Sequence, residues 1–267
     1  MNREQLIKKL RSFFDQKNFH EVQIPVFNSA VPAEENIHPF IVNGFYLSTS
    51  PERALKLELA KGIGNCYGIG HSFRDLEGTG PNHTPEFLML EWYRESADYK
   101  NIMDDVKELF RKFGIQSDWQ TFSLSQLFSD IGINLEKDDL VERAKEKGYN
   151  TADATWSQMF DQIFLNEIEP KLPNTAFFLV DFPTRISRLC KLQKDRPFFA
   201  ERFEAYVGGL EIGNGNTEET DVSKLQSIND LEFLEALSKM HGKNYAGIGI
   251  GIERLLKVLP TSVAKSL

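Results

Sequence analysis

The sequence predicts an α+β fold in which helices pack against an antiparallel sheet. Apolar residues recur at helical spacing near the N-terminus, whereas residues 65–74 and 86–94 have the pattern of two strands around a polar, glycine-bearing loop. A Gly-Gly pair at 208–209 is suited to a tight hairpin turn. With 267 residues, 41% of them hydrophobic, and no internal repeat, the chain is expected to form a single domain over residues 1–267.

Composition and charge narrow the functional class. The longest apolar stretches, such as residues 176–180, are far too short to cross a bilayer, and the N-terminus begins with a charged amphipathic segment. We therefore expect a cytoplasmic protein without a membrane partner. The net charge of −8 weighs against extensive contact with a phosphate backbone. Cys66 and Cys190 lack metal-ligand spacing and are expected to be buried free thiols.

The N-terminal part is expected to contain a helix, a strand and a second helix. Apolar residues between positions 6 and 14 recur at helical spacing. Residues 20–26 then alternate as a strand that ends at Pro25. Ser50 is a suitable N-cap for a helix over residues 51–61, whose first position is a proline.

The middle of the chain continues the alternation of strands and helices. Along the strand 86–94, a period of two places Phe87, Met89, Glu91 and Tyr93 on one face and Leu88, Leu90 and Trp92 on the other. Asp98 is the expected cap of an apolar helix that extends to residue 113. Residues 114–173 are expected to form a mostly helical insertion without a catalytic group. Strand patterns return at 176–182 and 203–212, and a last long helix begins near Asp230.

Arg74 is the first candidate for chemistry. It follows an alternating strand, and an arginine at a strand end in a cleft suits the bidentate capture of phosphate or carboxylate oxygens. Taken alone, a surface salt bridge would be the more common role for such a residue. His83, Glu86 and Phe87 follow it, and the resemblance of this order to the order in a known enzyme family favours a ligand-binding role.

The stretch 247–251 alternates glycine with isoleucine, so one face of this strand is bare backbone while the other is anchored in the core. A bare face allows a ligand to approach Gly249 closely, although a strand packed on another backbone would have the same pattern. Glu253 and Arg254 follow at the start of an apolar helix. This arginine beside the bare strand favours the ligand-binding interpretation.

Glu204 and Glu211 flank the predicted Gly-Gly turn. If the turn centres there, residue 204 lies opposite 213 and residue 211 lies opposite 206, so both glutamates project from the same face. Like charges so close need a cation, and Mg²⁺ bound to carboxylates and to ATP phosphates would supply it. The alternative is a solvated hairpin edge.

These segments together resemble the second and third signature motifs of class II aminoacyl-tRNA synthetases. The resemblance is carried by residues 73–77 with 83–87, and by residues 247–254. Within that class it is greatest for the lysyl branch, above all for the short paralogue that modifies elongation factor P. It implies a six- or seven-stranded antiparallel sheet flanked by helices, and a homodimer formed through the first helix and the strand that ends at Pro25.

The resemblance also implies the roles of individual residues. Arg74 would hold the α-phosphate and the substrate carboxylate, and Arg254 the γ-phosphate of a bent ATP. The remaining ATP contacts would be Glu77, His83 and Phe87, with Phe87 stacked on adenine. Glu204 and Glu211 would hold Mg²⁺, and Gly249 would form the floor of the amino-acid pocket.

Residues 211–221 resemble the lysine-recognising stretch of lysyl enzymes. A buried ammonium needs paired acids and hydrogen-bond acceptors, because leaving it bare costs several kcal/mol. By the resemblance, Glu218, Glu91 and Tyr93 would hold the side-chain amine and Glu52 the α-amine, with Asn214 and Asn216 also lining the pocket. Asn216 stands where the lysyl family has an aromatic residue, so the pocket is expected to hold lysine less tightly.

The function implied is ATP-dependent activation of lysine or a lysine-like amino acid as an adenylate, and its transfer to a protein lysine on an elongation factor P-like acceptor. The chain has no room for the N-terminal anticodon-binding barrel of a full-length lysyl enzyme, which disfavours tRNA as a substrate. Two alternatives remain open at this point. One is transfer to tRNA or to a small amine, and the other is a degenerate synthetase domain that binds ligands or partners as a regulator.

Overall fold

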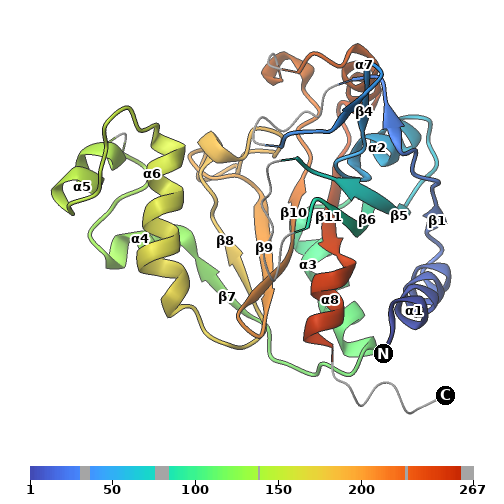
Figure 1. The fold of residues 1–267 in the computed structure, drawn as a ribbon, viewed down its shortest axis with the longest axis horizontal. Helices are drawn as coiled ribbons and strands as arrows, with labels where there is room; N and C mark the ends of the chain where they lie inside the picture. Colours follow the sequence, from blue (N-terminus) through green and yellow to red (C-terminus); the bar gives the residue numbers. More distant parts are fainter. Residues whose placement is uncertain (31–36, 76–83, 138, 226–227, 260–267) are drawn as a thin grey trace.

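The computed structural model describes residues 1–30, 37–75, 84–137, 139–225 and 228–259. Within these ranges the main sheet has eight strands in the order β1-β5-β6-β11-β10-β9-β8-β7 (Figure 1). Their bounds are β1 His20–Glu21, β5 Cys66–Phe73, β6 Glu86–Glu95, β7 Gln120–Ser123, β8 Phe177–Val180, β9 Arg202–Val207, β10 Leu210–Thr217 and β11 Tyr245–Gly251. The predicted α+β fold with an antiparallel sheet is confirmed.

The number of strands exceeds the expected six or seven because both edges carry an added strand. The six inner strands pair antiparallel, whereas β1 pairs parallel with β5 and β7 pairs parallel with β8. Parallel pairing needs a long crossover connection. Both edge pairs have one, since α2 (Glu52–Ala60) lies between β1 and β5 and a helical segment lies between β7 and β8.

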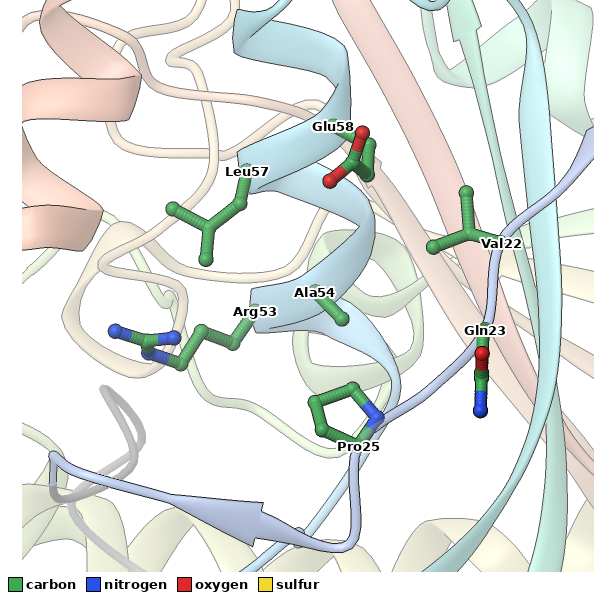
Figure 2. Close-up of a pocket in the computed structure, with 7 residues that line it drawn as sticks. All are labelled: Val22, Gln23, Pro25, Arg53, Ala54, Leu57 and Glu58. Carbon is green, nitrogen blue, oxygen red and sulfur yellow. The ribbon is translucent and has the colours of Figure 1, made fainter.

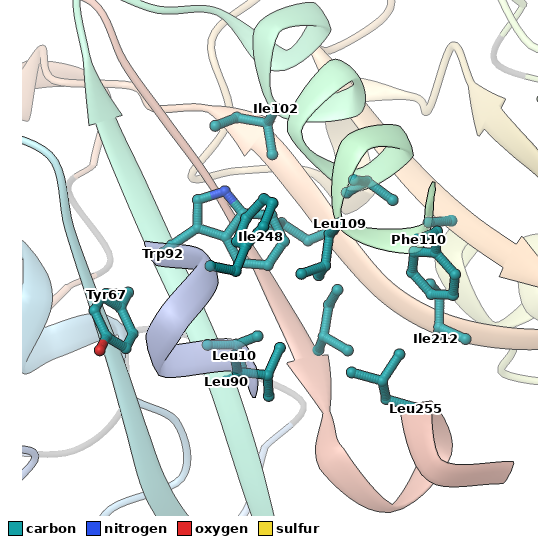
Figure 3. Close-up of a cluster of buried hydrophobic side chains, with 14 of the residues drawn as sticks. Leu10, Tyr67, Leu90, Trp92, Ile102, Leu109, Phe110, Ile212, Ile248 and Leu255 are labelled. Carbon is teal, nitrogen blue, oxygen red and sulfur yellow. The ribbon is translucent and has the colours of Figure 1, made fainter. Parts of the chain in front are cut away.

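Three helices cover one face of the sheet: α1 (Arg3–Gln16), α3 (Tyr99–Lys112) and α8 (Ile252–Val258). Figure 3 shows their side chains meeting those of β6, β10 and β11. Trp92 and Ile248 are the centre of this core, and both are essentially inaccessible to solvent. The even-numbered residues of β6 therefore face the core, as the period of two predicted, and the odd-numbered ones face the opposite side.

The opposite face of the sheet carries α2 and α7 (Leu231–Met240), which pack on each other and on β5 and β6. Arg53 of α2 joins the two helices, since its guanidinium donates to Asp230 at 2.6 Å and to Glu232 at 2.6 Å. The buried free thiols Cys66 and Cys190 also lie on this side of the sheet, and burial raises the pKa of each to about 12. Neither thiol is therefore suited to nucleophilic chemistry.

The segment between β7 and β8 is mostly helical and has its own core. It contains α4 (Leu124–Asp130), α5 (Leu140–Glu146), α6 (Trp156–Ile163) and the short turns η1 (Phe164–Ile168) and η2 (Glu169–Lys171). Figure 1 shows these helices at the β7 end of the sheet, far from α1 and α2. Their apolar side chains pack on Phe177 and Leu179 of β8 and on Tyr206 of β9. Two further short helices are η3 (Thr184–Ile186) and η4 (Val222–Lys224).

The expected strand over residues 20–26 is much shorter in the structure. β1 pairs only through His20–Glu21, and the next residues leave the sheet so that Ile24 lies against the glycine positions 68 and 70 of β5. Pro25 lacks an N–H and cannot continue a ladder. The chain then enters a small second sheet of β2 (Phe27–Asn28), β4 (Phe45–Leu47) and β3 (Ile41–Val42).

Two further local expectations need correction. The helix α2 begins at Glu52, one residue later than predicted, with Pro51 as its N-cap residue; the Ser50 hydroxyl still accepts the Glu52 N–H at 3.3 Å. In the hairpin, the turn glycines 208 and 209 have φ of 63° and 74°, as a two-residue turn requires. A bulge between Glu211 and Gly213 then shifts the register, so Glu204 lies opposite Asn214 instead of Gly213.

Within the described residues, no helix combines the length and the hydropathy needed to cross a membrane.

Candidate active site

The bare face of β11 is only partly open. A Cβ at Gly247 would lie 2.4 Å from atoms of the Tyr93 ring, so this ring covers the backbone there. Two residues further along, a Cβ at Gly249 would meet only Met89 Sδ at 3.3 Å and Glu91 Oε2 at 3.8 Å. The open floor at Gly249 therefore lies beside a buried carboxylate, and the Tyr93 hydroxyl donates to Glu91 Oε1 at 2.6 Å.

Glu218, directly after β10, lies on the same side of the sheet and is 3% exposed. Its Oε1 accepts from Asn216 Nδ2 at 3.1 Å. Burial and the neighbouring Glu52 carboxylate raise the pKa of Glu218 to about 7, although Lys56 and Asn216 partly offset them. Asn214 lies further along β10, opposite Gly249, and is exposed. The strand order thus brings Glu91, Tyr93, Asn216 and Glu218 together.

The structure adds Lys56, which the sequence analysis did not identify. Its Nζ donates to Glu52 Oε1 and to Glu218 Oε2, each at 2.5 Å, and the side chain is 1% exposed. The two carboxylates hold the pKa of Lys56 above its usual range despite burial. A sequence signal did exist, because Lys56 is four residues after Glu52 and lies between Leu55 and Leu59 on the buried face of α2.

Arg74 lies just beyond β5, next to Phe87 at the start of β6. Its guanidinium carbon is 5.2 Å from the Phe87 ring centre, and its Nε donates to the Thr49 carbonyl at 3.2 Å. Phe87 was expected to stack on adenine, and in this structure its ring packs with the Arg74 guanidinium. Glu77 and His83, the other expected nucleotide contacts, lie outside the described residues.

At the other end of the sheet face, Arg254 in the first turn of α8 contacts the hairpin. Its Nη1 donates to the Glu211 carbonyl at 3.0 Å and to the Glu211 carboxylate at 3.2 Å. The expected phosphate ligand and one expected metal ligand are therefore in direct contact. The neighbouring Glu253 has a structural role, because its carboxylate accepts the Leu88 N–H at 3.1 Å and forms an ion pair with Arg3 at 2.9 Å.

Glu204 and Glu211 remain close despite the register shift. Burial, followed by the charge of Glu211, raises the pKa of Glu204 to about 7. Arg202 and the Tyr206 hydroxyl donate to Glu204 at 3.0 and 3.2 Å and only partly offset this effect. Two carboxylates that repel each other in this way favour a bound cation.

Comparison with known proteins identifies the family. The sequence profile of the class II tRNA synthetases of the D, K and N type matches residues 1–263. The chain belongs to this family. It is therefore an enzyme of the ligase class, of the type that uses ATP to activate an amino acid.

Two groups of curated proteins are similar to this class II synthetase. The elongation factor P--(R)-beta-lysine ligase of Buchnera aphidicola subsp. Schizaphis graminum is 30% identical, with 97% of this chain and 90% of the relative covered. A homolog of that ligase from Aquifex aeolicus is 31% identical, with 94% and 92% covered. The lysine--tRNA ligase of Chloroflexus aurantiacus is 29% identical over 96% of this chain, which spans only 61% of that relative.

In this class II synthetase the expected site residues form two groups on one face of the sheet. The amino-acid group is Glu52, Glu91, Tyr93, Asn216, Glu218 and Gly249, and the phosphate group is Arg254, Glu204 and Glu211. Within the described residues, no cluster of three or more metal-ligating side chains is present. Two carboxylates nonetheless fit Mg²⁺, which takes one or two carboxylates together with substrate phosphates and water.

Proposed function

We propose that this ligase activates lysine, or a similar basic amino acid, by reaction with ATP to form an aminoacyl-adenylate and pyrophosphate. The observation that supports the substrate is the pair of buried carboxylates on one face of the sheet: Glu91 lies beside the open floor at Gly249, and Glu218 lies further along that face, directly after β10. An ammonium between them would have charged acceptors and the Tyr93 hydroxyl close by, and all three side chains are largely closed to water. Burial of carboxylates costs several kcal/mol unless a cation accompanies them.

The phosphate group of residues would supply the catalytic contacts. The substrate carboxylate attacks the α-phosphorus in line and pyrophosphate leaves, so no protein nucleophile is required. Arg74 would neutralise charge at the α-phosphate and Arg254 at the γ-phosphate. Mg²⁺ held by Glu204 and Glu211 would neutralise the remaining phosphate charge.

For the acceptor we propose a lysine side chain on an elongation factor P-like protein. Two similar curated proteins, 30% and 31% identical to this chain, are named as an elongation factor P ligase and a homolog of one. The acidic net charge of −8 also weighs against a nucleic-acid acceptor. ATP and translation factors are cytoplasmic, and we propose the same location for this reaction. Transfer to tRNA or to a small amine is the alternative.

A second candidate function is that of a regulator that binds ligands without catalysis. The observation that favours it is Lys56, whose ammonium already bridges two of the carboxylates expected to hold the substrate. In that case the internal lysine would replace the substrate lysine in the pocket.

Pyrophosphate exchange with a panel of amino acids tests the proposed function. We expect exchange with lysine or β-lysine and none with amino acids that have neutral side chains. If no amino acid of the panel supports exchange although the protein still binds ATP, the result would support the second candidate function, that of a regulator. Incubation with labelled lysine, ATP and the candidate factor should then label the factor, and labelling of bulk tRNA instead would overturn the proposed acceptor.

We also propose that the ligase is a homodimer through its first helix and the segment that ends at Pro25, as the class II resemblance implies. Large apolar side chains are exposed on the small sheet and the segment before it: Val26 44%, Phe27 52%, Ile41 66%, Val42 41% and Phe45 52%. The pairing register puts Phe27, Val42 and Phe45 on the same face of this small sheet, and exposed apolar side chains that share a face are common at protein interfaces. Figure 2 shows the adjoining pocket, in which Val22, Gln23 and Pro25 face Ala54, Leu57 and Glu58 of α2.

A further inference from the structure

The carboxylate of Glu204 is held from both sides along its own strand. Its Oε1 accepts from Arg202 Nη2 at 3.0 Å, and its Oε2 accepts from the Tyr206 hydroxyl at 3.2 Å. The three residues alternate along β9, so their side chains share one face of the sheet. A carboxylate has about four lone-pair sites. Each oxygen of Glu204 therefore keeps an acceptor position for a cation or water after it has bound its donor.

The ring of Tyr206 is fixed independently of this hydrogen bond. It stacks on the ring of Phe177 in β8, with ring centres 4.8 Å apart and ring planes at 6°, and the residue is 3% exposed. Apolar side chains of the helical segment between β7 and β8 belong to the same core. In the register of β9 and β10, Tyr206 lies opposite Glu211, the other proposed metal ligand. The packing of the ring therefore determines where its hydroxyl can donate.

A structural role is the alternative explanation of this contact, because a buried tyrosine hydroxyl usually has a hydrogen-bond partner. The partner of Tyr206, however, is one of two neighbouring carboxylates that fit a bound cation. Groups that orient a metal-binding carboxylate reduce the rearrangement that metal binding requires. Loss of such a group typically weakens metal binding about ten- to a hundredfold.

We propose that Tyr206 is a positioning residue for the Mg²⁺ that accompanies ATP, because its hydroxyl holds the Glu204 carboxylate ready to bind the ion. This inference rests on the proposed function, in which that ion neutralises phosphate charge. Arg202 holds the other oxygen of Glu204, but its guanidinium also donates to the Ile186 carbonyl at 2.8 Å and packs on the Phe182 ring. Tyr206→Phe gives the sharper test, since it removes one hydroxyl and keeps the stacked ring.

The experiment is calorimetric titration of the full chain with ATP, once with excess Mg²⁺ and once with EDTA, at pH 8, which is above the pKa of about 7 of Glu204. The ratio of the two affinities measures how far the ion tightens ATP binding, and it needs no catalysis. Tyr206→Phe should lower this ratio about tenfold and leave the affinity for metal-free ATP unchanged.

The matched control is Tyr149→Phe. The Tyr149 hydroxyl also donates to a glutamate, Glu167, at 3.0 Å, and its ring packs on the same core as Tyr206. Neither Tyr149 nor Glu167 belongs to the proposed site. Loss of this hydroxyl should therefore change neither of the two ATP affinities.

A double-variant cycle separates positioning from a structural role. If the Tyr206 hydroxyl acts through Glu204, Tyr206→Phe should not lower the affinity ratio further in a protein that already carries Glu204→Gln. An equal loss in both backgrounds, an unchanged ratio in Tyr206→Phe, or a Tyr206→Phe protein that thermal unfolding shows to be unfolded would overturn the positioning role and leave the proposed function intact. A wild-type protein that binds no ATP under either condition would overturn the proposed function itself.

Discussion

The chemistry of single residues in this ligase depends on which charges the fold buries together. Glu218 is the clearest case, because its pKa of about 7 results from burial and from the nearby Glu52, partly offset by Lys56 and Asn216. The same residue on a solvated strand would be fully ionised at neutral pH. Lysine binding is therefore expected to be coupled to a proton.

The first prediction concerns the pH dependence of that binding. Below pH 7 the Glu218 carboxyl of the free protein is mostly protonated, since its pKa is about 7 even beside Lys56, and it must lose its proton to pair with a second ammonium from the substrate. Lysine should bind about tenfold more weakly at pH 6 than at pH 8 and release a proton on binding at the lower pH. Calorimetry in buffers with different ionisation enthalpies measures both quantities. Equal affinity at both pH values, without proton release, would contradict the prediction.

The second prediction concerns Glu211, which contacts Arg254 and is a proposed Mg²⁺ ligand. Glu211→Gln should lower the rate of lysine-dependent pyrophosphate exchange about a hundredfold, because one charge contact at a transition state contributes about 3 kcal/mol. The dependence on magnesium concentration should shift upward as well. Glu235→Gln, at an exposed glutamate of α7, is the control and should leave the rate unchanged.

At the scale of elements, β11 combines two kinds of glycine on one face. Gly247 lies under the Tyr93 ring, whereas Gly249 lies open beside Glu91. The alternation of glycine with isoleucine in the sequence does not distinguish these two glycines. Only the neighbouring strand distinguishes them, because the side chain of Tyr93 projects over one position and leaves the next uncovered.

Alanine substitution at each glycine should therefore have different consequences. Gly247→Ala places a methyl group against the Tyr93 ring and should destabilise the protein by about 1–3 kcal/mol. Gly249→Ala should unfold at nearly the wild-type temperature but bind lysine more weakly, because its methyl group intrudes on the pocket floor. Thermal unfolding and lysine titration of both variants measure the two effects. Full lysine affinity in Gly249→Ala would show that substrate does not approach this position.

The hairpin β9–β10 shows a second effect at the element scale. A Cβ at Gly213 would lie 2.1 Å from the Gly249 carbonyl oxygen, so the two backbones approach more closely than any side chain would allow. The bulge between Glu211 and Gly213 accompanies this approach and moves the partner of Glu204 by one residue. Glu204 and Glu211 nevertheless remain electrostatic neighbours, which is the property that the metal proposal needs.

At the scale of the whole molecule, the exposed apolar surface on β3 and β4 predicts self-association. Val42→Asp combined with Phe45→Asp should give a folded monomer, since both side chains share one face of the small sheet, are exposed in the single chain and leave no cavity when removed. Sedimentation of the wild-type protein should show a dimer. Leu165→Asp is the control, because Leu165 is 55% exposed on the helical segment far from the small sheet. If the wild-type protein sediments as a monomer, the proposed dimer is wrong, and the assignment of the fold is unaffected.

The sequence by itself determined the local structure of this protein, that is, the direction of side chains along an element and the position of a turn. Periodicity predicted which face of β6 carries Glu91 and Tyr93, and the glycine pair predicted the hairpin turn, because side-chain direction and turn geometry depend on residues close together in the chain. The motifs around Arg74 and Arg254 indicated the family, which the comparison confirmed. These features need no knowledge of distant contacts.

Only the tertiary structure decided how separate segments meet. Lys56 has the sequence context of an ordinary helix residue, and its role became visible only when β10 placed Glu218 next to α2, 162 residues away in sequence. The shortened β1 and the hairpin bulge likewise depend on close packing, of Ile24 against β5 and of β10 against β11. The physical reason is that burial and charge pairing are properties of the whole arrangement, whereas a sequence pattern records only the preferences of neighbouring residues.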